Sequence, residues 1–169
     1  SADEDSTAHL ASDEAADNLR KLCLDFLING WDAARKRQNT VAARNSIFRT
    51  GGRDMDAFDR IMELSRQGLY CAQIMVQLAL DAEGRENPEL VQAVRGLCGG
   101  FAWSGGPCGA LSGGVCFLSL LGRGLDATGR TALIGEFHAW FRERTEQYGG
   151  ENCENIERGD PGNMLTICP

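Results

Sequence analysis

Histidine is nearly absent from this sequence. Only His9 and His138 occur among the 169 residues, which disfavours histidine-rich zinc sites and centres that need two histidine ligands. The seven cysteines also lack any C-x-x-C or C-x-x-C-H spacing. Zinc ribbons, thioredoxin-type motifs and covalently attached c-type haem are therefore not expected, and we predict that the chain binds no haem.

Positive charge is also scarce, since 17 Lys and Arg against 24 Asp and Glu give a net charge of −7. We therefore expect no nucleic-acid partner, because sequence-independent binding needs a basic surface that displaces counterions. Six of the acidic residues lie in residues 1–17, which contain no Lys or Arg. We predict a mobile acidic arm over residues 1–12 and a single helical domain over 13–169.

Residues 33–53 reverse this balance, because they contain six Lys and Arg residues and no acidic residue. One interpretation is a solvated helix or hairpin. The other is a docking patch for an acidic redox partner, as would suit an accessory subunit of a larger redox complex.

A long run of large apolar residues is missing as well. The longest uncharged stretch, residues 96–122, contains nine glycines and Pro107, whereas a membrane span needs about 20 mostly large apolar residues. We predict a buried loop and helix here and no membrane span. No export signal is recognisable and the chain starts at Ser1 rather than Met, so the expected location is cytoplasmic or periplasmic.

Apolar residues recur at helical spacing along most of the chain, without clear strand alternation. The pattern predicts an all-α, single-domain bundle of about six helices with a glycine-rich central loop and helix. We place Pro107 at the first position of its helix, where a missing N–H is tolerated. The predicted helices cover about 12–30, 55–68, 71–84, 88–96, 108–121 and 126–149, with a short helix after residue 152.

Three cysteines, Cys71, Cys108 and Cys153, share a position at the start of a predicted helix. Unpaired N–H groups and partial positive charge at a helix N-terminus lower a thiol pKa and favour the thiolate. Three converging helix starts would stabilise a thiolate–metal centre, with Cys168 folding back as a fourth ligand. The alternatives are metal-free dithiol redox chemistry and plain core packing.

The other cysteines and nearby residues are interpreted more simply. Cys23 and Cys116 lie among apolar residues and are expected mainly in the core, while Cys98 at a helix end is ambiguous. Gly109 and Gly113 share one helix face, where a backbone or an inorganic cluster could approach closely. Tight helix packing explains these glycines equally well. Trp103 is expected to shield a buried centre from water.

Four segments carry a resemblance to a known family. They are Gly68-Leu-Tyr-Cys71-Ala-Gln73, Cys98-Gly-Gly-Phe101, Cys108-Gly109-Ala110-Leu111-Ser112-Gly113, and the later Cys153 and Cys168. Over about residues 65–168 the chain resembles the redox-active C_GCAxxG_C_C family, which is marked by a CGAxxG motif and four cysteines. Related domains occur in split-Soret cytochromes, which are dimeric bacterial proteins with haem and an iron–sulfur centre.

The resemblance implies a bacterial redox protein that binds an iron–sulfur cluster, with [2Fe–2S] as the expected type. It maps the four family cysteines onto Cys71, Cys108, Cys153 and Cys168, with Cys98 and Cys116 as additional candidate ligands. It further implies a homodimer and a redox partner protein, and an electron carrier or redox sensor more than a catalyst.

Overall fold

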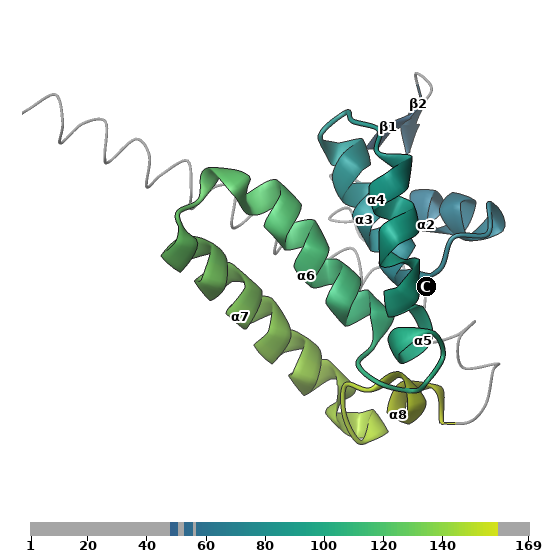
Figure 1. Cartoon of the computed structure of the whole chain (residues 1–169), viewed down its shortest axis with the longest axis vertical. Helices are drawn as coiled ribbons and strands as arrows, with labels where there is room; N and C mark the ends of the chain where they lie inside the picture. The colour runs from purple at the N-terminus through teal and green to yellow at the C-terminus, as the bar shows by residue number, and fades with distance from the viewer. Residues whose placement is uncertain (1–47, 51–52, 56, 159–169) are drawn as a thin grey trace, which may run out of the picture.

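The computed structural model describes residues 48–50, 53–55 and 57–158 (Figure 1). In this part of the chain helices dominate, which confirms the predicted all-α fold class. The longer helices are α2 (Ala57–Arg66), α3 (Cys71–Ala82), α6 (Gly109–Leu121) and α7 (Ala127–Thr145). The shorter ones are α4 (Pro88–Ala93), η2 (Val94–Leu97), α5 (Cys98–Phe101), η3 (Gly122–Gly124), η4 (Glu146–Tyr148) and α8 (Cys153–Glu157).

A short antiparallel hairpin precedes α2. Strand β1 (Phe48–Thr50) pairs with β2 (Arg53–Met55), so that Phe48 lies opposite Met55. The prediction that Met55 begins the next helix is therefore wrong, because the chain is still extended there and α2 starts at Ala57. The hairpin interpretation fits this end of the basic segment. The rest of that segment, the acidic arm and the predicted helix over 12–30 lie outside the described residues.

Helix α6 is central to the described part of the chain. It packs against α3 and α7, and it runs antiparallel to α7 (Figure 1). Glycines make both approaches close: a Cβ at Gly113 would lie 2.7 Å from Ala72 Cα, and one at Gly114 would lie 2.5 Å from Phe137 Cζ. The close packing of α6 against α3 thus explains why residue 113 is a glycine, as the packing alternative predicted.

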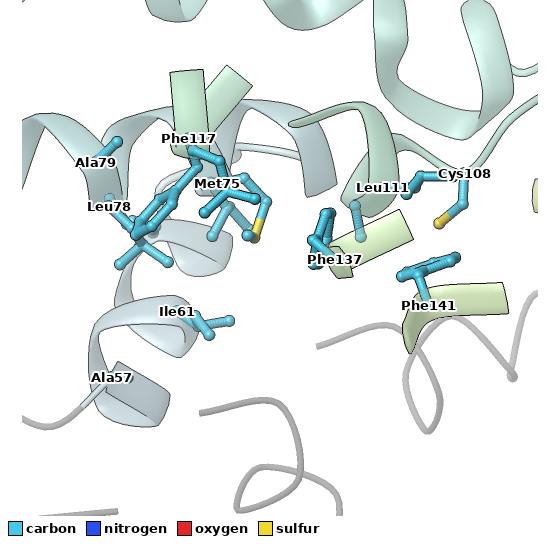
Figure 2. Packing of buried hydrophobic residues seen from close by; sticks show 14 of the residues in the cluster. Ala57, Ile61, Met75, Leu78, Ala79, Cys108, Leu111, Phe117, Phe137 and Phe141 are labelled. Atoms are coloured by element: carbon cyan, nitrogen blue, oxygen red, sulfur yellow. The ribbon is translucent and has the colours of Figure 1, made fainter. Parts of the chain in front are cut away.

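Large apolar side chains from α2, α3, α6 and α7 form the main core (Figure 2). Each fully buried side chain of this kind stabilises the fold by about 1.5–3 kcal/mol. None of the helices in the described part of the chain combines the length and apolar composition that crossing a membrane requires. The largest fully buried side chains of this core are Leu64, Leu78, Phe117, Leu118, Leu133 and Phe141.

Helix caps agree with the sequence at α7 but not at α6. The Asp126 carboxylate accepts the N–H of Gly129 at 2.7 Å and caps α7 as predicted. Pro107, predicted at the first helical position, instead forms an isolated bridge with Asn152, and Cys108 is the N-cap of α6. The segment stays extended here because backbone hydrogen bonds tie it to the residues that precede α8.

Candidate functional site

Cys71 is the first residue of α3, and a buried glutamine holds this end of the helix in place. The side-chain oxygen of Gln73 accepts the N–H of Tyr70 at 3.3 Å, which satisfies one of the unpaired donors at the helix start. The Gln73 amide also donates to the carbonyl of Val91 at 3.2 Å. Gln73 therefore fixes the start of α3, and with it Cys71, against α4.

A run of five left-handed residues follows Cys98. Glycine adopts positive φ freely, whereas each of the three non-glycine residues costs about 1–2 kcal/mol in this conformation. The N–H of Trp103 donates to the carbonyl of Cys98 at 3.2 Å and closes the turn. The φ angles are 64° at Gly99, 67° at Gly100, 59° at Phe101, 53° at Ala102 and 62° at Trp103.

The sulfur atoms of Cys71 and Cys98 are hydrogen-bonded to each other. Cys98 is 0% exposed and Cys71 is partly exposed. The Cys98 sulfur also accepts the backbone N–H groups of Ala72 and Gln73, in the first turn of α3, and the Cys71 sulfur accepts that of Gly99. The two thiols therefore form one hydrogen-bonded unit with its own set of backbone donors.

The pKa values of the two thiols are shifted in opposite directions. The hydrogen bond from Cys71, reinforced by the backbone donors and by the positive charge of Arg95, lowers the pKa of Cys98 from 9.0 to about 6 in spite of burial. The same hydrogen bond raises the pKa of Cys71. At neutral pH the pair therefore holds one proton, on Cys71, and one negative charge, on Cys98.

Cys108 and Cys153 lie at the starts of α6 and α8, as predicted. The sulfur of Cys108 accepts the backbone N–H groups of Ala110 and Leu111, but burial outweighs them and raises its pKa. Burial is also the main cause that raises the pKa of Cys153 to about 11. The prediction that helix starts lower the thiol pKa is therefore wrong for all three cysteines. Desolvation of the thiolate exceeds the stabilisation from the helix terminus at Cys108 and Cys153, and the hydrogen bond with Cys98 is the main cause of the raised pKa at Cys71.

The loops that carry these cysteines are joined by backbone hydrogen bonds. The N–H of Cys108 donates to the carbonyl of Glu151 at 3.0 Å, and the N–H of Cys153 donates to that of Gly106 at 2.7 Å. Cys108 interacts electrostatically with both Cys71 and Cys153. α5, which begins at Cys98, contacts α3, α6 and α8 (Figure 1). Cysteines distant in the sequence are thus gathered at one end of α6.

Gly109 has a specific role at this end of α6. A Cβ at position 109 would collide with the sulfur of Cys71, and it would lie 3.0 Å from the carbonyl oxygen of Leu97. No side chain fits at this position without displacing Cys71. The close approach predicted at Gly109 is therefore observed, and the group that approaches is the thiol of Cys71.

The described residues do not assemble a metal site by themselves. Among the described residues, no group of three His, Cys, Asp or Glu side chains is placed so that it could hold a metal ion. Cys168, the fourth predicted ligand, lies outside the described residues, as does Cys23. Cys116 packs against Val76 and Leu80 in a second apolar cluster, in line with its interpretation as a core residue.

Trp103 lies beside the pair but is half exposed, at 50%. Its ring meets that of Tyr70 edge to face, with centroids 5.1 Å apart, and a Cβ at Gly99 would lie 2.7 Å from it. The ring therefore covers the glycine turn next to Cys98 on one side and meets solvent on the other.

Sequence reasoning missed the central role of Cys98 in this arrangement. Its dipeptide Gly99-Gly100 was the available signal, because two glycines after a cysteine permit a sharp left-handed turn. A Cβ at Gly100 would collide with the carbonyl oxygen of Gly106, so the turn depends on glycine there. Nothing in the spacing of 27 residues between Cys71 and Cys98 indicates that the two sulfurs meet.

Comparison with known proteins gives one match. Residues 69–168 match the model of a family described as putative redox-active protein (C_GCAxxG_C_C). The searches of curated proteins and of solved structures found no match. The family model covers more than half of the chain and contains six of its cysteines: Cys71, Cys98, Cys108, Cys116, Cys153 and Cys168. The chain belongs to this redox-active family.

Proposed function

We propose that this member of the C_GCAxxG_C_C family is a thiol–disulfide redox protein whose working group is the Cys71–Cys98 dithiol. The observation that carries the proposal is the hydrogen bond between the two sulfurs, of which one belongs to the partly exposed Cys71 and the other to the buried and acidic Cys98. The thiolate is the nucleophile in thiol–disulfide exchange, so a pair that ionises below neutral pH is ready to react.

Cys71 takes the first step because it is partly exposed, whereas Cys98 is fully buried. A substrate disulfide reaches Cys71 from solvent, and Cys71 passes its proton to Cys98 along their hydrogen bond. The Cys71 thiolate then attacks one substrate sulfur, which breaks the substrate S–S bond, forms a mixed disulfide and releases the other half as a thiolate.

Cys98 completes the reaction. Its proton passes to the released thiolate, and the Cys98 thiolate attacks the Cys71 sulfur of the mixed disulfide. The Cys71–Cys98 disulfide forms and the second half of the substrate leaves as a thiolate. Two electrons have moved from the dithiol to the substrate disulfide, and the one proton held by the pair has gone with them. The backbone N–H groups of Ala72 and Gln73 stabilise Cys98 as the attacking thiolate.

Trapping experiments test these roles. When the reduced chain reacts with a substrate disulfide, we expect Cys98→Ser to accumulate the mixed disulfide on Cys71, because the second attack is lost. Cys71→Ser should form no adduct at the pair, and Cys116→Ser should behave as wild type because Cys116 packs in a separate cluster. Peptide mass mapping identifies each product. A mixed disulfide that resolves equally fast in Cys98→Ser would refute the proposal.

A second candidate is an electron carrier that binds an iron–sulfur cluster, with [2Fe–2S] as the type, through Cys71, Cys108, Cys153 and Cys168. The favouring observation is that backbone N–H groups point at the sulfurs of Cys71 and Cys108, as donors to cluster thiolates do. Thiolates are also the ligands such clusters take. A bound cluster would supply one-electron transfer. A homodimer and a redox partner protein belong to this candidate.

Metal analysis separates the two candidates. Protein purified without oxygen would contain iron and acid-labile sulfide if the cluster is present, and its visible absorption would survive Cys23→Ser and disappear in Cys108→Ser. The dithiol proposal expects protein without iron or sulfide in which Cys108→Ser still forms the Cys71–Cys98 disulfide.

A further inference from the structure

The exposed aromatic side chains of the described residues are concentrated around the dithiol. Tyr70 is 40% exposed, Phe101 48% and Trp103 50%, and these are the large apolar side chains that face solvent in the described part of the chain. Tyr70 directly precedes Cys71, and the other two belong to the turn that follows Cys98. Exposed apolar patches of this kind mark binding sites more often than other parts of a protein surface do.

The backbone that displays two of these side chains is strained. Phe101 and Trp103 are displayed by the left-handed turn, with φ of 59° and 62°. Strained backbone of this kind persists where the surrounding structure enforces it, and it concentrates at functional sites. The turn thus holds two aromatic side chains at the surface beside a reactive pair, at a cost in folding free energy.

A single cation completes the surface. The Arg95 guanidinium lies 5.6 Å from the centre of the Tyr70 ring, and Tyr70 in turn contacts Trp103. Arg95 is exposed. Among the described residues no carboxylate forms an ion pair with it, whereas Arg85 and Arg123 are both paired with Glu83. A guanidinium without a carboxylate beside a redox pair is suited to bind the carboxylate of a substrate.

We propose that Tyr70, Arg95 and Trp103 form the substrate-binding surface of the dithiol and that the substrate is an acidic peptide disulfide. Arg95 binds a carboxylate of the peptide, and the rings of Tyr70 and Trp103 contact its flat amide groups. The substrate disulfide is thereby held beside the partly exposed Cys71. This inference rests on the proposed thiol–disulfide function and adds the class of substrate.

The test compares two substrates that share one peptide backbone but carry different numbers of carboxylates. The probes are oxidised glutathione and the disulfide of glutathione monoethyl ester, in which one carboxylate of each half is capped. The reduced full chain is mixed with each probe, and the second-order rate of Cys71–Cys98 disulfide formation is measured. We expect wild type to prefer the acidic probe, and Arg95→Gln to lower its rate with that probe by roughly threefold to fivefold, the size typical of an exposed charge pair.

The matched variants identify the cause. Arg95→Gln should lower the rate with the ester less than the rate with the acidic probe, because the loss of its charge acts on Cys98 with both probes but removes a carboxylate contact only with the acidic one. Arg95→Lys should retain the preference in part, and Arg85→Gln should match wild type. A variant Arg95→Gln that loses rate equally with both probes would show that Arg95 acts through the reactivity of the thiols, and it would overturn the inference while the proposed function stands. Failure of both probes to oxidise the wild-type pair would instead refute the proposed function.

Discussion

A buried thiol normally becomes less acidic, because the thiolate is harder to remove from water than the thiol. Cys108 and Cys153 follow this rule. Cys98 departs from it because a neighbouring thiol and two backbone N–H groups all donate to the same sulfur. Three hydrogen-bond donors thus decide which of the gathered cysteines carries negative charge at neutral pH.

The ionisation of Cys98 can be followed directly in solution. Ultraviolet thiolate absorbance of the reduced chain should rise with a midpoint near pH 6, the pKa that the Cys71 hydrogen bond gives Cys98. Cys98→Ala should remove this step, and Cys116→Ala should retain it. A first thiolate step at pH 9 or above in wild type would contradict the account of the pair.

The same shift makes stability depend on pH. Between pH 6 and 9 the folded pair holds one proton fewer than the unfolded chain, because the pKa of Cys98 falls from 9.0 to about 6 on folding. The stabilisation is therefore present above pH 9 and lost as the pH falls through 6. We expect the free energy of unfolding of the reduced protein to rise from pH 6 to 9 more steeply than that of Cys98→Ala. Denaturant titrations at several pH values measure this difference, and parallel curves would contradict it.

Gly109 gives a packing test at the residue scale. Gly109→Ala should destabilise the fold by about 1–3 kcal/mol, because its Cβ collides with the Cys71 sulfur in a crowded site. Gly135→Ala in α7 is the matched control, since a Cβ there meets nothing within 4 Å. The control should stabilise the protein by about 0.5–1 kcal/mol, as alanine does in a helix. Denaturation midpoints report both effects, and a stabilising Gly109→Ala would contradict the described contact.

At the scale of elements, the left-handed turn is the most costly feature. Ala102 has φ of 53° and is exposed, so Ala102→Gly removes strain without removing packing. We expect a net gain of about 0.5 kcal/mol, because relief of the left-handed strain exceeds the entropy gained by the unfolded chain. Ala132→Gly, at an exposed position inside α7, should instead cost about 1 kcal/mol. Thermal unfolding of both variants checks the opposite signs, and equal losses would contradict the turn geometry.

Helices whose ends are set by local chemistry could be predicted from the sequence. Asp126 caps α7 through its own carboxylate, and Pro88 opens α4, so nearby residues were sufficient. The turn after Cys98 could not be predicted, because Phe101, Ala102 and Trp103 have no local preference for positive φ. Contacts with the rest of the fold, such as the hydrogen bond from the Gly106 N–H to the Gly100 carbonyl, keep it in place.

At the scale of the whole molecule, the placement of α6 between α3 and α7 determines which cysteines meet. The helix starts with Cys108, and its small residues allow α3 to approach until Cys71 reaches Gly109. The sequence indicated the cysteines and the helix starts. It did not indicate the pairing of Cys71 with Cys98, because that contact depends on how three elements pack. Cys168 lies outside the described residues, and its role as a ligand stays a prediction.

The most direct test of the dithiol is a disulfide map of the full chain before and after oxidation. Protein prepared without oxygen is fully reduced, treated with oxidised glutathione, alkylated and analysed by peptide mass mapping. We expect the loss of two thiols, a disulfide between Cys71 and Cys98, and free Cys108 and Cys153. A disulfide that joins other cysteines, or retention of both Cys71 and Cys98 as free thiols, would contradict the dithiol proposal.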